Sequence, residues 1–128
     1  MSTEQGPELL TERTLTGIFV HLFGPIFGIL LAGPVYYATD HAFTRENARH
    51  VLNWHLTLLA VLGGLLVWIL AVEYGGIPDA LAIVLFLPLF VAFFYMTLGT
   101  IFFAIIGTIK AVFGSPWKYP LAPEFIDK

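Results

Sequence analysis

The chain has 128 residues, of which 58% are hydrophobic and only 12% are charged. Soluble domains average about 45–50% apolar and about 25% charged residues, and a domain this small has mostly surface. A soluble fold would therefore expose many large apolar side chains. Lys and Arg number six against nine Asp and Glu, and cysteine is absent. The composition excludes a typical soluble enzyme, a nucleic-acid binder with its basic surface, and any disulfide or cysteine chemistry.

Three stretches of the chain contain no Asp, Glu, Lys or Arg, and they are 26, 23 and 30 residues long: 14–39, 50–72 and 80–109. A membrane-spanning helix needs about 20 apolar residues. The first stretch predicts one span from Leu15 to Tyr37, and the second predicts another. The third is too long for a simple span and too short for two. It predicts one long helix, tilted or kinked, with a re-entrant fold-back as the alternative.

These stretches predict an all-α fold, an integral membrane helical bundle of three transmembrane helices, with a four-segment arrangement as the alternative. The predicted parts are a polar N-terminal tail over 1–13, a transmembrane helical domain over 14–114 and an interfacial C-terminal tail over 115–128. Most Lys and Arg lie in the first connection and near the C-terminus. Because cytoplasmic loops are enriched in these residues, three crossings of a cell membrane would leave the N-terminus outside and the C-terminus in the cytoplasm.

The first span carries small residues and one histidine. Gly24, Gly28 and Ala32 recur at helical spacing, and such residues let helix backbones approach closely. They indicate packing against the other spans, against a second copy, or against a partner subunit. His21 is an ionisable residue inside a membrane, which makes it a candidate for function. Either it relays a proton or binds a polar group, or it is a neutral imidazole bonded to a nearby threonine or another helix.

The connection after the first span is the most polar part of the middle of the chain. Its helical period places Arg45, Arg49 and Asn53 on one face, and His55 follows where the second span begins. The two arginines either meet lipid phosphates or an acidic partner, or they belong to a solvated helix start that is held by pairs with Glu46.

No catalytic or metal site is predicted. His41, His50 and His55 lie nine and five residues apart, whereas zinc ligands on helices usually lie three or four residues apart. The sequence also contains no Ser-centred nucleophile motif, no paired carboxylates and no Gly-rich phosphate loop. We therefore expect no enzyme and no cofactor. In the C-terminal tail, Trp117, Lys118 and Tyr119 combine interfacial aromatic rings with a cation, which predicts a membrane-interface anchor.

Several features together support a family comparison: His21, Gly33-Pro34, the stretch Leu52-Asn53-Trp54, the run 117–121 and Phe125-Ile126. Over about residues 18–126 the chain resembles the DUF4870 family of small multi-pass membrane proteins. That family is itself similar to the twenty-kilodalton subunit of the chloroplast inner-envelope protein translocon. Its members often have Gln where this chain has His55. The resemblance implies a small helical membrane protein without an established reaction, linked to protein translocation or membrane assembly.

The sequence thus predicts a non-enzymatic accessory or scaffold subunit that acts through helix and protein contacts. Its expected partners are the lipid bilayer and either further copies of itself or another membrane protein, with no nucleic acid. The alternative is an oligomeric channel or transporter component, because three spans cannot enclose a polar path alone. Its candidate lining residues would be His21, Asn53, His55, Tyr95 and Thr100.

Overall fold

The computed structural model describes residues 13–127, and the regular structure in that range is entirely helical. Residues 1–12 of the predicted N-terminal tail, and Lys128, lie outside the described residues. The helices follow in the order α2 (Leu15–Phe27), α3 (Ile29–Ala38), α4 (Ala42–Tyr74) and α5 (Asp79–Val112). The prediction of an all-α fold is confirmed. The prediction of three helices is wrong, because the described chain forms four.

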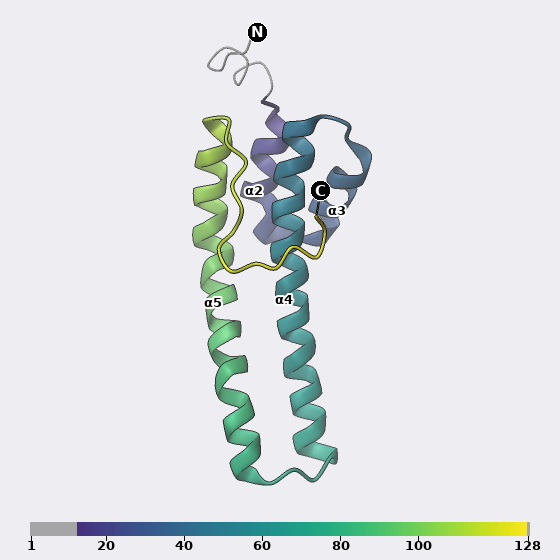
Figure 1. Cartoon of the computed structure of the whole chain (residues 1–128), viewed down its shortest axis with the longest axis vertical. Coiled ribbons are helices and arrows are strands. Elements are labelled where there is room, and N and C mark those ends of the chain that lie inside the picture. Colours follow the sequence, from purple (N-terminus) through teal and green to yellow (C-terminus); the bar gives the residue numbers. More distant parts are fainter. Residues whose placement is uncertain (1–12, 128) are drawn as a thin grey trace.

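The first charge-free stretch is not a single span. α2 ends at Phe27, and Gly28 connects it to α3, which runs back toward the start of α2 (Figure 1). Gly28 has a φ of 56°, which glycine adopts readily because it has no Cβ. With 13 and 10 residues, α2 and α3 are about 20 Å and about 15 Å long, too short for about 30 Å of hydrocarbon. The fold-back considered for the third stretch therefore occurs in the first.

The other two charge-free stretches form the long antiparallel helices α4 and α5 (Figure 1). α4 has 33 residues and α5 has 34, and both are long and apolar enough to cross a membrane. α5 continues through Pro88 as one helix, so residues 80–109 do not fold back. The turn between the helices contains Gly75, Gly76 and Pro78, which are typical helix-ending residues.

α2 lies beside only the first part of α4. A Cβ at Gly17 would lie 2.7 Å from the Phe43 ring, and one at Gly28 would lie 3.3 Å from the His55 ring. α2 therefore covers α4 from about Phe43 to His55, and beyond that point α4 and α5 continue as a pair (Figure 1). We call the part that contains α2, α3, the first residues of α4 and the last part of α5 the four-helix end, and the remainder the two-helix end.

The buried core lies at the four-helix end, and the C-terminal tail completes it. After α5 the chain returns along α4 and α5 (Figure 1). Tyr119 and Ala122 of this tail are only 2% and 4% exposed. They join a cluster of buried side chains from all four helices: Val20, Ala32, Tyr36, Ala48, Val51, Leu52, Trp54 and Met96. The tail is thus part of the folded core, whereas the two-helix end presents large apolar side chains to its surroundings.

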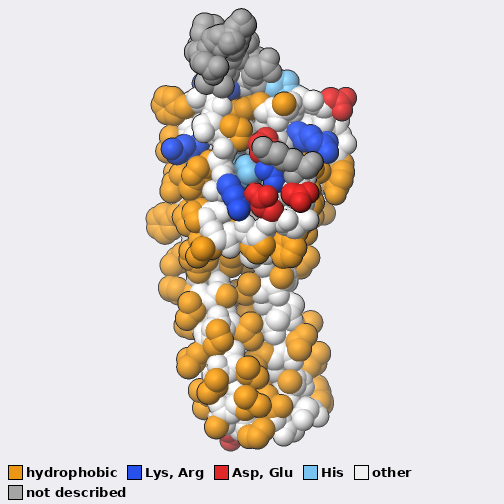
Figure 2. Space-filling model, in the orientation of Figure 1, with side chains coloured by type: hydrophobic (Ala, Val, Ile, Leu, Met, Phe, Trp, Pro, Cys, Tyr) orange, Lys and Arg blue, Asp and Glu red, His pale blue; other side chains and the backbone are white. Residues whose placement is uncertain are grey.

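The start of α2 and the end of α5 lie together. The Arg13 guanidinium donates a hydrogen bond to the Val112 carbonyl, so α2 begins beside the residue at which α5 ends. Lys and Arg side chains gather at this four-helix end, and the opposite tip is almost entirely apolar apart from acidic groups (Figure 2). The prediction that the N- and C-terminal tails lie on opposite sides of the membrane depended on three crossings. Because the first stretch folds back at Gly28, that prediction loses its support.

Candidate functional site

His21 lies at the centre of a buried polar network that joins α2, α4 and the tail. Asn47 Nδ2 donates to the Phe43 carbonyl at 2.8 Å, so its Oδ1 is free to accept from His21 Nε2 at 2.6 Å. His21 Nδ1 then accepts from the Tyr119 hydroxyl at 2.9 Å. Burial raises the pKa of Tyr119 above its ordinary value, so this hydroxyl keeps the proton that it donates. Both nitrogens of the imidazole therefore have partners inside the protein.

α5 approaches the same imidazole closely. A Cβ at Gly107 would lie 2.6 Å from His21 Nδ1, a distance that leaves no room for any larger residue. The His21 side chain is fully buried, and its ring stacks on that of Tyr119 with centroids 5.6 Å apart. Of the interpretations open for His21, the structure places it in hydrogen bonds to a neighbouring helix and to the tail.

Asn53 holds the last part of the tail against α4. Its Nδ2 donates to the Ile126 carbonyl at 2.8 Å, and its Oδ1 accepts from the Ile126 amide at 2.8 Å. Arg49 also donates to the Ile126 carbonyl, at 3.2 Å. A pair of hydrogen bonds to one residue's backbone resembles the pairing of two strands. Contact of this face of α4 with lipid or a partner was one of two interpretations, and in the structure the face binds the chain's own tail.

Arg49 belongs to a group of charged residues around a shallow hollow. Its guanidinium bonds both carboxylate oxygens of Glu46, at 3.1 and 2.8 Å, and lies 3.6 Å from Glu124. Lys118 lies 3.5 Å from the other oxygen of Glu124. The open hollow, of about 630 Å³, is lined by Glu46, Arg49, His50, Glu124 and Asp127. The Nδ1 atom of His50 is buried there without a hydrogen-bond partner among the described residues.

The second arginine has a different environment. Arg45 donates to the Tyr36 carbonyl at 3.1 Å, and its guanidinium lies 4.2 Å from the centre of the Tyr36 ring. It therefore fixes the end of α3 against the start of α4. Arg45 bonds α3 and Arg49 bonds Glu46 and the tail, and both arginines line a small pocket of about 210 Å³.

Trp54 is the aromatic centre of the four-helix end. It is fully buried, and its indole N–H donates to the Thr100 hydroxyl at 2.9 Å. Its ring packs against those of Tyr95, Phe103 and Tyr119, with centroids 5.3–5.9 Å apart. A Cβ at Gly99 would lie 2.7 Å from the Trp54 ring. Trp54 therefore joins α4, α5 and the tail, and glycine at position 99 makes room for it.

The small residues of the first stretch do not form one stripe. A Cβ at Gly24 would lie 3.1 Å from Val51, so Gly24 faces α4. Gly28 lies at the break between helices, and Ala32 is fully buried in α3. Each of them thus lies within the chain's own fold.

The tail residues separate into surface and core. Lys118 is exposed, Trp117 packs on Phe103 and Tyr119, and Tyr119 itself is buried. The predicted interfacial anchor therefore has its tyrosine in the core and not at the surface.

The residues proposed to line a channel make hydrogen bonds within the protein. Beyond His21 and Asn53, His55 Nδ1 lies 2.9 Å from the Val51 carbonyl, and Tyr95 donates to the Pro120 carbonyl at 2.7 Å. Thr100 accepts from Trp54 and donates to the Met96 carbonyl. These polar atoms hold helices and tail together. Within residues 13–127, no three His, Asp or Glu side chains are arranged to hold a metal ion.

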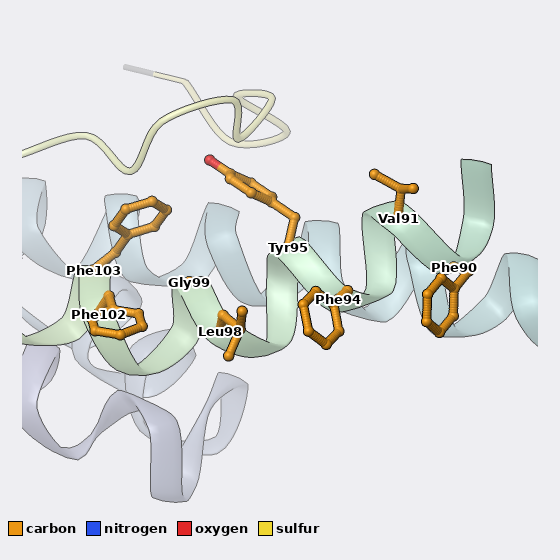
Figure 3. Close-up of a pocket in the computed structure, with 8 residues that line it drawn as sticks. All are labelled: Phe90, Val91, Phe94, Tyr95, Leu98, Gly99, Phe102 and Phe103. Carbon is orange, nitrogen blue, oxygen red and sulfur yellow. The ribbon is translucent and has the colours of Figure 1, made fainter. Parts of the chain in front are cut away.

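An apolar groove of about 470 Å³ runs along the exposed side of α5, and Gly99 contributes to its lining. In Figure 3, Tyr95 and Phe103 point toward the tail, which borders the groove on that side. Phe90 and Phe94 lie along the other side of the helix (Figure 3). No charged side chain lines this groove, which suits contact with hydrocarbon.

Sequence reasoning missed Asn47 and the role of the tail. Asn47 follows Phe43 by one turn and precedes Val51 by one turn, so it lies on an apolar face of α4. An amide on an apolar helix face could have indicated a buried polar network, because a buried polar group requires a hydrogen-bond partner. The partners Tyr119 and Ile126 gave no comparable signal, because nothing in a proline-rich tail indicates which helix it contacts.

Comparison with known proteins identifies one family. Residues 12–126 match the model of the magnetosome magnetite crystal formation protein family. No curated protein and no solved structure matches the chain. The resemblance to DUF4870 and to the chloroplast translocon subunit was wrong, because the matching family is a different one and no homologue supports the translocon likeness. The match covers almost the whole chain, and the protein belongs to the magnetosome magnetite crystal formation family.

Proposed function

We propose that this chain is a magnetosome membrane protein that takes part in magnetite crystal formation as a non-enzymatic accessory or scaffold subunit. The observation that carries the proposal is the family match over residues 12–126. The fold is consistent with it, because two long apolar helices can cross a membrane and the polar groups of the four-helix end are largely used in holding that end together.

We further propose that the four-helix end faces the cytoplasm and the turn between α4 and α5 faces the opposite side. The described Lys and Arg residues all lie at or near the four-helix end: Arg13, Arg45, Arg49, Lys110 and Lys118. The far turn is flanked by Glu73 and Asp79 and contains no basic residue. Cytoplasmic loops carry the excess of Lys and Arg, so both described ends of the chain would lie on the cytoplasmic side.

Contacts between copies are part of this proposal. At the two-helix end, α4 and α5 expose apolar side chains, and nothing lies within 4 Å of a Cβ placed at Gly63. Small residues at open positions allow the backbones of two membrane helices to approach closely. A scaffold of this kind would use the two-helix end for association and the four-helix end for contacts at the membrane surface.

The proposal is tested in a magnetite-forming bacterium from which its own member of this family has been deleted. We expect expression of this chain to restore crystal dimensions, measured by electron microscopy, and the chain to fractionate with the magnetosome membrane. The matched control expresses a chain in which Trp54→Ala and Asn53→Ala disrupt the four-helix end. If the wild-type chain reaches that membrane and the crystals still match those of the deletion strain, the proposed function is wrong.

A further inference from the structure

The two ends of the molecule differ in width. α2 lies beside α4 from about Phe43 to His55, as the contacts of Gly17 and Gly28 show, and α3 packs on the start of α4 through Tyr36 and Arg45. That segment is about 20 Å of a helix that is about 50 Å long. At that level the protein contains four helices and the tail, and over the remaining length it contains two (Figure 1). Since each helix is about 10 Å across, the helical cross-section roughly doubles at one end.

The charges on α4 locate this wide part relative to the bilayer. Arg49 is the last charged residue of α4 before Glu73, and residues 50–72 between them are 23 in number. They span about 35 Å, close to the hydrocarbon thickness of about 30 Å. The segment from Phe43 to His55 therefore lies at the headgroups and the outermost acyl carbons of one leaflet. α2 and α3 add their volume at that depth.

The outer flank of the wide part is suited to lipid. α2 exposes large apolar side chains along its length, among them Leu15 at 70% and Ile26 at 71%, and Leu30 of α3 is 83% exposed. This surface is continuous with that of α5, since α2 packs along α5 at Gly107 and residues 101–109 of α5 contain no charge. The same bilayer that surrounds the two-helix end thus also contacts α2, on the side away from the charged hollow.

We propose that the chain is shaped for a curved bilayer, with the four-helix end in the convex leaflet. A helical hairpin that occupies the headgroup level of one leaflet, while only two helices continue through the other, fits a leaflet whose headgroups are spread apart. Shallow apolar insertions respond to curvature for this reason. This inference depends on membrane insertion and not on magnetite formation, so it can fail while the proposed function holds, and the reverse.

Membrane tubes pulled from giant phosphatidylcholine vesicles provide the test, because the outer leaflet of a tube is convex. The chain has no cysteine, so a single Ser115→Cys marks the four-helix end and a single Asp79→Cys marks the far turn. A membrane-impermeant dye then labels only proteins that present the chosen end outward. Flotation before labelling removes protein that has not inserted.

Each label reports one orientation of the same fold. For Ser115→Cys we expect the density of labelled protein per lipid to be about twofold or more higher in the tube than in the vesicle. For Asp79→Cys we expect it to be lower in the tube, because that population has its wide end in the concave leaflet. Equal densities for both labels, or a shift in the same direction for both, would overturn the proposal. The two orientations need not be equally abundant, because the density of each labelled variant in the tube is compared with the density of the same variant in the vesicle.

Discussion

Asn53 and Ile126 exchange two hydrogen bonds of 2.8 Å each, although 73 residues separate them in sequence. The side-chain amide of Asn53 presents a donor and an acceptor with the spacing of a peptide unit, and Ile126 supplies the matching amide and carbonyl. This pair fixes the end of the tail on α4 near His55, which lies beside the Gly28 junction between α2 and α3. The tail thereby covers the buried network of His21, Asn47 and Tyr119.

Replacing Asn53 by Ala is expected to destabilise the four-helix end. The Ile126 amide would lose its partner in a partly buried place, which costs about 1–3 kcal/mol, whereas the Ile126 carbonyl would keep the hydrogen bond from Arg49. The free energy of unfolding in detergent micelles measures the effect. Thr97→Ala is the matched control, because Thr97 is exposed and its hydroxyl bonds only its own helix at Phe93. Equal stability of the two variants would contradict the pairing with Ile126.

A double-mutant cycle tests the bond between His21 and Tyr119. We expect Tyr119→Phe alone to cost about 1 kcal/mol, since it removes one hydroxyl and leaves His21 Nδ1 unpaired. His21→Ala costs more, because it also leaves a cavity in a packed core. Since the side chains touch, the cycle should give a coupling of about 0.5–3 kcal/mol. Strict additivity of the two substitutions would show that the hydrogen bond is absent.

Two glycines of the long helices are expected to respond oppositely to the same change. Gly107→Ala would place a methyl group 2.6 Å from His21 Nδ1, and overpacking of this kind costs about 1–3 kcal/mol. Gly63→Ala meets nothing within 4 Å, and Ala is favoured over Gly in a helix by about 0.5–1 kcal/mol. Thermal unfolding in one detergent compares them. A loss of stability at position 63 equal to that at position 107 would contradict this packing.

The fold-back at Gly28 predicts a specific topology. Single cysteines at Thr16, Asp40 and Ser115 should all react with an impermeant reagent from the same side of the membrane, whereas one at Asp79 should react from the other side. Vesicles of known orientation provide the measurement. Three complete crossings would instead place Thr16 opposite Ser115, so a Thr16 cysteine that reacts together with Asp79 would exclude the fold-back.

The long helices were predictable because each depends on local composition. Residues 80–109 lack charge and contain one internal proline, and they form a single helix. The break in the first stretch was not predictable in the same way. α2 continues through Pro25, a residue that usually disturbs a helix, and ends at Gly28. A glycine at helical spacing can pack against a neighbour or reverse the chain, and hydropathy does not distinguish these.

Tertiary contacts account for the rest of what sequence reasoning missed. Arg49 and Asn53 were identified as one polar face, which is a local property of α4. Their partners Glu124 and Ile126 lie in a segment without regular structure, whose path depends on side chains far away in sequence. The tail was therefore expected to lie at the membrane interface, whereas Tyr119 and Ala122 are in the core.

The position of Ile126 has a consequence for biosynthesis. Tyr119, Ala122 and Ile126 follow α5 in the chain, so they are synthesised after all four described helices. Until they emerge from the ribosome, the imidazole of His21 and the amide of Asn53 lack the partners that the tail supplies. The core of the four-helix end is therefore completed only after the tail has been made, and not when α5 emerges.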